Sequence, residues 1–138
     1  MRKQVDELRR QLDEQISQMV ELSETAIAKV TKALESGSKE QARVIISEDE
    51  EIDQLEKDIE RLCLKLLLQQ QPVAKDLRRI SAALKMITDM ERIGDQTSDI
   101  AEINISSKGD AATDEIHVIG KMASEVSKMV RNSVTAYV

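Results

Sequence analysis

The sequence predicts an all-α protein, in which an antiparallel three-helix bundle of long helices is followed by a fourth helix that begins a second, incomplete three-helix repeat. Three observations favour this fold class. The 138 residues include no Trp, no Phe and one Tyr, so an aromatic-rich sheet is disfavoured. Apolar residues recur at spacings of three and four over long stretches, as on a buried helix face. With only four Gly and one Pro, the chain has few places to turn.

The first two helices are predicted to form a tight antiparallel pair. The first covers residues 5–36, and Gly37 follows it as a natural helix stop. Ser38 and Gln41 have the spacing of a capping box, which starts a second helix over residues 39–70. Because the connection is so short, these two helices must lie side by side and run in opposite directions.

The third and fourth helices are separated by the one longer loop-like stretch, which contains Gly109. Pro72 suits the first position of the third helix, which is predicted over residues 72–106. Residues 1–107 are therefore expected to form the bundle, and residues 108–138 a linker and the first helix of an incomplete second repeat. The expected buried face of this fourth helix carries Ile116, Ile119, Met122, Val126, Met129, Val130 and Ser133.

Two pairs of carboxylates interrupt the apolar faces of the second and third helices. Asp49 and Asp53 are four residues apart, as are Glu91 and Asp95, so each pair lies on one side of its helix. In a hairpin turning at Pro72, Asp53 and Glu91 are each 19 residues from the turn, and Asp49 and Asp95 are each 23. The two pairs are therefore predicted to face each other at one level of the bundle.

Four carboxylates held close together repel one another and must protonate, pair with cationic side chains or bind a cation. Hard cations that prefer oxygen ligands, such as Mg, Mn, Ca or oxidised iron, would relieve this repulsion. Glycine inside a helix costs about 1 kcal/mol relative to alanine. One reason for Gly94 at this position is that backbone or a ligand approaches the helix closely there. The alternative is that these acids lie on a solvated flank of the bundle.

Composition argues against several classes of function. A net charge of −6 disfavours nucleic acid as a partner, and no apolar run is long enough to span a membrane. Cys63 is alone, which fits a small buried residue in a cytoplasmic protein. His117 is the single His and is expected to be exposed, which weighs against a ferritin-type di-iron site. No nucleophile–base pair is visible, so an enzyme is disfavoured. The basic residues Arg78, Arg79 and Lys85 are expected to be solvated surface.

Several segments of this sequence closely resemble the PhoU family of phosphate-transport regulators, and the resemblance runs continuously through all four predicted helices. The residues that carry it are Asp49-Glu50-Glu51-Ile52-Asp53, Leu55-Glu56, Ile59-Glu60, Gln70-Gln71-Pro72-Val73-Ala74-Lys75-Asp76-Leu77-Arg78 and Glu91-Arg92-Ile93-Gly94-Asp95.

The resemblance implies a fold of two similar three-helix bundles and a role without catalysis in the bacterial cytoplasm. It implies negative regulation of phosphate uptake and of phosphate-starvation signalling, with a phosphate ABC transporter and a sensor histidine kinase as partners. The family's carboxylate motifs are associated with metal clusters, and Asp49, Asp53, Glu91 and Asp95 match the motif positions of the first bundle. The resemblance implies iron or zinc, and the oxygen ligands add manganese and magnesium, so the expected cofactor is an iron, zinc, manganese or magnesium ion.

Against that pattern, this sequence stops after its fourth helix, which cannot persist as an isolated amphipathic rod. We expect it to pack on its own bundle or on another copy, giving a homo-oligomer such as a helix-exchanged dimer. Two alternatives from other classes are a metal-storage or oxidase bundle, which would need His ligands, and a structural coiled-coil adaptor without metal.

Overall fold

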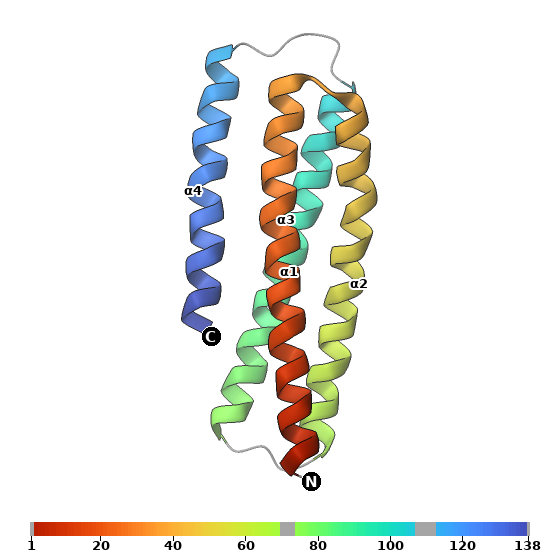
Figure 1. The fold of residues 1–138 in the computed structure, drawn as a ribbon, viewed down its shortest axis with the longest axis vertical. Helices are drawn as coiled ribbons and strands as arrows, with labels where there is room; N and C mark the ends of the chain where they lie inside the picture. The colour runs from red at the N-terminus through yellow and green to blue at the C-terminus, as the bar shows by residue number, and fades with distance from the viewer. Residues whose placement is uncertain (1, 70–73, 107–112, 138) are drawn as a thin grey trace.

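The computed structural model describes residues 2–69, 74–106 and 113–137 of the chain. They form four helices: α1 (Arg2–Ser36), α2 (Lys39–Gln69), α3 (Ala74–Ser106) and α4 (Thr113–Tyr137) (Figure 1). No strand occurs within these ranges, so the all-α fold class is confirmed. Pro72 and Gly109, where the sequence predicts the second and third turns, lie outside the described residues.

The connection between α1 and α2 has the local structure that its residues predict. Gly37 has a φ of 67°, a left-handed conformation that glycine adopts without steric cost. The backbone N–H of Gln41 donates a hydrogen bond of 3.2 Å to the Ser38 hydroxyl oxygen, which caps the first turn of α2. These two features reverse the chain within two residues, so α1 and α2 pack antiparallel.

The core lies between α1, α2 and α3 and consists mainly of aliphatic side chains. Helices α1 and α3 run in the same direction and α2 runs against them (Figure 1). The apolar residues that recur along α1 and α2 at spacings of three and four are largely buried, with Leu12, Ile16, Met19, Ile45, Ile59 and Cys63 among the residues with almost no exposed surface. Near the α1–α2 turn, small residues such as Ala33, Ala42 and Ala101 form a second cluster. Their size lets three helices approach closely there.

The residues that α3 buries in the core do not include Glu91 and Asp95. They form a row that passes through Ile87, Met90, Gly94, Thr97 and Ala101. Glu91 and Asp95 therefore stand at the margin of that row, next to α2, and do not point into the centre of the core.

Helix α4 packs on α1 of its own chain, which is one of the two arrangements that the sequence left open. The buried face expected for α4 is wrong in part. Val130 is buried and Ala123, Val134 and Tyr137 pack on the core, whereas Ile119, Met122, Val126 and Met129 are exposed. That expectation required neighbouring helices to cover the whole apolar stripe of α4. Because α4 packs mainly on α1, only the part of the stripe turned toward α1 is buried.

Two long-range contacts hold α4 in place. The Arg79 guanidinium on α3 donates two hydrogen bonds of 2.8 Å to Asp13 on α1, and it lies 5.2 Å from the centre of the Tyr137 ring. Farther along α4, Arg131 pairs with Glu24 of α1 at 3.4 Å. Arg79 is thus half-buried between three helices rather than solvated, in contrast to the expectation for this basic group, whereas Arg78 and Lys85 are exposed.

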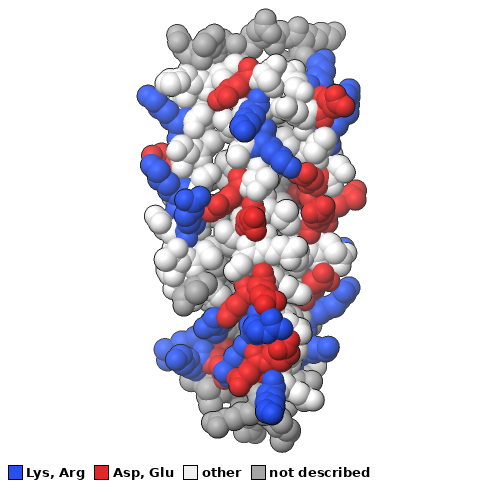
Figure 2. Space-filling model, viewed as in Figure 1, with Lys and Arg blue, Asp and Glu red and all other residues white. Residues whose placement is uncertain are grey.

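On the face shown in Figure 2, acidic and basic side chains alternate along the length of the molecule. That face presents no continuous basic surface of the kind that nucleic-acid phosphates require. Among the described helices, none combines the length and apolar character needed to cross a membrane. The predicted boundary at residue 107, between the three-helix bundle and the start of an incomplete second repeat, stays a prediction.

Candidate metal centre

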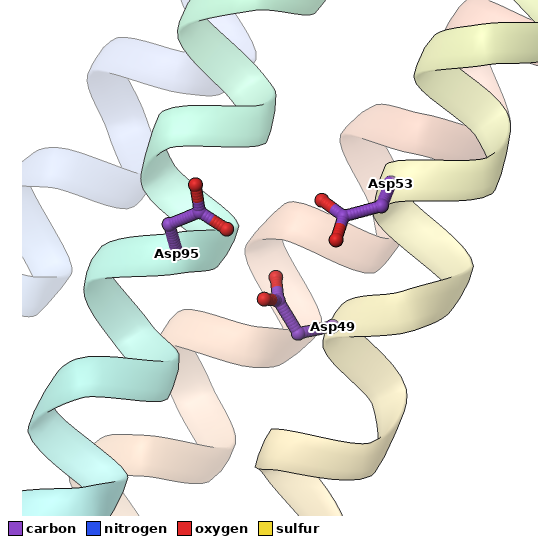
Figure 3. A group of neighbouring side chains, drawn as sticks. All are labelled: Asp49, Asp53 and Asp95. Carbon is purple, nitrogen blue, oxygen red and sulfur yellow. The ribbon is translucent and has the colours of Figure 1, made fainter.

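The predicted carboxylates meet where α2 and α3 run antiparallel. Asp49 and Asp53 stand one turn apart on α2, and Asp95 faces them from α3, with all three carboxylates turned toward the space between the helices (Figure 3). One oxygen from each of these three residues lies within 4.8 Å of the other two. The sequence predicted that these carboxylates would face each other because they lie equally far from Pro72, and α2 and α3 do bring them together.

A second group of carboxylates adjoins the first and shares Asp53 with it. Asp53 and Glu56 from α2 and Glu91 from α3 also offer oxygens that lie within 4.8 Å of one another. All four predicted residues thus belong to one continuous cluster, which Glu56 extends by one turn. We call Asp49, Asp53, Glu56, Glu91 and Asp95 the acidic cluster.

Glu56 was missed as a candidate in the sequence. Leu55 and Leu62 widen the apolar stripe of α2, so the pattern favours them over Glu56 on the core side of the helix. Both leucines are buried, yet Glu56 is only half-exposed at the edge of the same stripe. The signal that could have identified it is its position three residues after Asp53, which places it on the same side of α2.

Repulsion within the acidic cluster perturbs its titration. Burial, followed by the charges of Asp53 and Asp95, raises the pKa of Asp49 from 3.8 to about 6. A hydrogen bond shared with Asp95, together with burial, raises the pKa of Glu91 from 4.5 to about 8. Burial and the charge of Glu60 also raise the pKa of Glu56. Near neutral pH the folded chain therefore holds protons that isolated carboxylates would release.

Two oxygens of the cluster are buried and have no hydrogen-bond partner among the described residues: Oδ1 of Asp49 and Oδ1 of Asp53. A buried carboxylate oxygen without a donor loses its hydration and gains nothing in return. Lys29 on α1, which lines the same small pocket as Asp49, already pairs with Glu48 of α2 at 2.7 Å. The unpartnered oxygens are the feature that a bound cation would satisfy.

Gly94 makes the close approach possible. A Cβ at this position would lie 2.7 Å from Oδ1 of Asp49 and 3.1 Å from Cδ1 of Ile52. Any side chain at residue 94 would therefore displace the Asp49 carboxylate. One turn further, the Thr97 hydroxyl donates a hydrogen bond of 2.8 Å to the Gly94 carbonyl, so it is satisfied locally and does not compete for the cluster. The residues present fit a cation held entirely by oxygen ligands.

Other residues considered in the sequence lie elsewhere. His117 is exposed on α4, as expected, and it belongs to neither carboxylate group. Cys63 is buried in the core, and burial raises the pKa of its thiol to about 11, so it is a packing residue.

Comparison with known proteins identifies the family. A family model described as the PhoU domain matches residues 16–103, which is more than half of the chain and includes the whole acidic cluster. The chain belongs to the PhoU family. This confirms the resemblance carried by the motifs of α2 and α3.

Individual PhoU proteins show the same relationship over most of this chain. It is 36% identical over 129 residues to the phosphate-specific transport system accessory protein PhoU homolog of Clostridium acetobutylicum, covering 93% of this chain and 59% of that protein. The corresponding homolog of Aquifex aeolicus is 38% identical over 125 residues, with 91% and 57% covered. The crystal structure of PhoU from Pseudomonas aeruginosa matches with a TM-score of 0.87 at 27% identity, covering 96% of this chain and 64% of that one. This chain therefore spans less than two thirds of the length of these PhoU proteins.

Proposed function

We propose that this chain is a non-enzymatic regulator of phosphate uptake and phosphate-starvation signalling. Its membership of the PhoU family carries the proposal, because the relatives that match most of the chain are phosphate-specific transport system accessory proteins. In this role it would act in the bacterial cytoplasm and restrain a phosphate ABC transporter and its sensor histidine kinase. The long helices and their mixed-charge surface suit protein partners better than a small substrate.

We further propose that the acidic cluster binds a metal ion. The support is the convergence of five carboxylates, the raised pKa values of Asp49 and Glu91, and the two buried oxygens that have no partner within the part of the chain that the structure describes. Asp49, Asp53 and Asp95 would hold one ion, and Asp53 with Glu56 and Glu91 could hold a second beside it. Such oxygen ligands favour iron, manganese or magnesium, with zinc a weaker match. The bound ion would supply positive charge that fixes α2 against α3.

The regulatory proposal can be tested in a bacterium that lacks its own PhoU protein. We expect expression of this chain to lower phosphate uptake and to silence a phosphate-starvation reporter during growth in ample phosphate. Unchanged uptake and reporter activity, with the folded chain present in the cells, would contradict the proposal.

A matched pair of variants then tests whether the cluster takes part in regulation. Asp49→Asn with Glu91→Gln removes two carboxylates of the cluster, and we expect it to weaken repression. Glu50→Gln with Glu102→Gln removes two exposed carboxylates from the same two helices and should repress normally. Equal repression by both pairs would separate regulation from the cluster.

A further inference from the structure

A group of exposed leucines lies toward the turn between α2 and α3, at the end of the bundle opposite the α1–α2 connection (Figure 1). On α2, Leu64 is 56% exposed and Leu68 is 84% exposed, and on α3, Leu77 is 43% exposed. Leu64 and Leu68 are four residues apart, so they project from the same side of α2. We call Leu64, Leu68 and Leu77 the leucine patch.

The register of α2 and α3 brings the leucine patch together. Asp53 meets Glu91 in the acidic cluster, and the same antiparallel register, continued toward the turn, places Leu68 at the level of Leu77. Leu64 follows Asp53 by about three helical turns, and Leu77 precedes Glu91 by about four, so each leucine projects from nearly the same side of its helix as the carboxylate. The leucine patch therefore lies on the same α2–α3 face as the acidic cluster, nearer the turn.

Exposed basic side chains surround the leucine patch. Two stand beside its leucines on α2 and two on the outer side of α3: Arg61, Lys65, Arg78 and Lys85. We call these four residues the basic rim. Residues 57–85 include seven Lys or Arg and three Asp or Glu, in a chain whose net charge is −6. This part of the chain is therefore positively charged, although the chain as a whole is negative.

We propose that the leucine patch and the basic rim form a docking surface for an acidic amphipathic helix of a partner protein. Apolar side chains of that helix would cover the leucines, and Asp or Glu on both of its flanks would meet the basic rim. The size suits a helix, because residues 75–85 of α3 extend about 15 Å, which is the length of about three helical turns.

Charge and composition favour a partner helix over an anionic membrane. Helices that rest on membranes commonly insert Trp or Phe, and this chain contains neither. Asp53 is about 16 Å along α2 from Leu64, so a flat anionic surface resting on the leucine patch would also approach the acidic cluster. A helix of about three turns can stay on the leucine patch, where it meets cations rather than carboxylates.

The test is fluorescence anisotropy of the purified 138-residue chain with two labelled peptides. Each peptide has about 20 residues, enough to form a helix, with Leu at alternating spacings of three and four. One peptide carries Glu on both flanks of its leucine stripe, and the other carries Lys at the same positions. We expect the Glu peptide to bind at least about tenfold more tightly than the Lys peptide, and added salt to weaken its binding.

Variants of the chain locate the binding surface. Leu68→Glu places a carboxylate in the leucine patch and should lower the affinity for the Glu peptide about tenfold. Lys65→Glu with Arg78→Glu reverses part of the basic rim, so it should weaken the Glu peptide and strengthen the Lys peptide. Val44→Glu is the matched control, because Val44 is 46% exposed near the other end of α2. It should bind the Glu peptide as the wild type does, and circular dichroism should show unchanged helical content in all variants.

Three results would overturn the proposal. One is a Glu peptide that binds no more tightly than the Lys peptide. Another is an affinity for the Glu peptide that Leu68→Glu leaves unchanged or that Val44→Glu lowers equally. The third is co-sedimentation of the chain with vesicles of phosphatidylcholine and phosphatidylserine in place of peptide binding, which would assign the surface to a membrane. None of these measurements depends on phosphate regulation, so this inference and the proposed function can fail separately.

Discussion

Replacing Gly94 with alanine has two opposing effects: it favours the helix and it crowds the acidic cluster. Alanine is favoured over glycine inside a helix by about 1 kcal/mol. At residue 94, however, the added Cβ would lie 2.7 Å from Oδ1 of Asp49 and 3.1–3.3 Å from two carbons of Ile52. Crowding of this kind in a packed interface costs about 1–3 kcal/mol. The free energy of unfolding of Gly94→Ala should therefore fall by about 0–2 kcal/mol.

The same substitution should weaken metal binding, because Asp49 must rotate away from the other carboxylates to make room. Displacing the groups that orient a ligand typically lowers metal affinity about 10–100-fold. Isothermal titration calorimetry with Mn²⁺ measures the affinity, and urea denaturation of the metal-free protein measures the stability.

Gly120→Ala on α4 is the matched control. A Cβ there meets only Glu35 Oε1, at an ordinary contact distance of 3.7 Å. This variant should gain about 0.5–1 kcal/mol of stability and bind Mn²⁺ as the wild type does. The reasoning is refuted if Gly94→Ala is stabilised as much as Gly120→Ala and retains full affinity.

Three further predictions concern titration, the attachment of α4 and the first turn. Because folding raises the pKa of Asp49 to about 6 and that of Glu91 to about 8, the metal-free folded state binds more protons than the unfolded state between about pH 4 and 8. Its stability should therefore fall as pH rises through that window, and Glu91→Gln should flatten the dependence in urea titrations; an unchanged slope would contradict this. Tyr137→Ala removes the ring beneath Arg79 and should cost about 1–3 kcal/mol and speed amide exchange in the last turns of α4, whereas Tyr137→Phe keeps that ring and should change both much less. Ser38→Ala removes the cap of α2 and should lower the free energy of unfolding by about 1 kcal/mol in thermal or urea denaturation, with Ser38→Gly less affected; equal stability of Ser38→Ala and wild type would show that the cap contributes nothing.

Local signals predicted much of the fold. Gly37 and Ser38 determine where α1 ends and α2 begins through interactions with their immediate neighbours, so that boundary could be predicted from the sequence alone. The level at which the carboxylates meet could also be predicted, because two straight antiparallel helices joined at one turn have a simple register. Asp49 and Asp95, 46 positions apart in the sequence, come together for that reason.

Features that depend on a third element could not be predicted in this way. Glu56 lies at the edge of the apolar stripe of α2, and only the position of α3 decides that it meets Glu91. Arg79 resembled a surface residue because its contact with Tyr137 requires α4 to fold back along α1. The exposure of Met122 likewise depends on which helices surround α4, information that periodicity within α4 does not contain.

The most direct test of the metal proposal is elemental analysis of the chain purified without chelator from cells supplied with iron, manganese and zinc. The account predicts stoichiometric metal in the wild type and in the Glu50→Gln, Glu102→Gln control. It predicts loss of that metal in Asp49→Asn with Glu91→Gln, with helical content unchanged. Wild-type protein carrying no more metal than the Asp49→Asn, Glu91→Gln variant would contradict it, and the acidic cluster would then be stabilised by its shared protons alone.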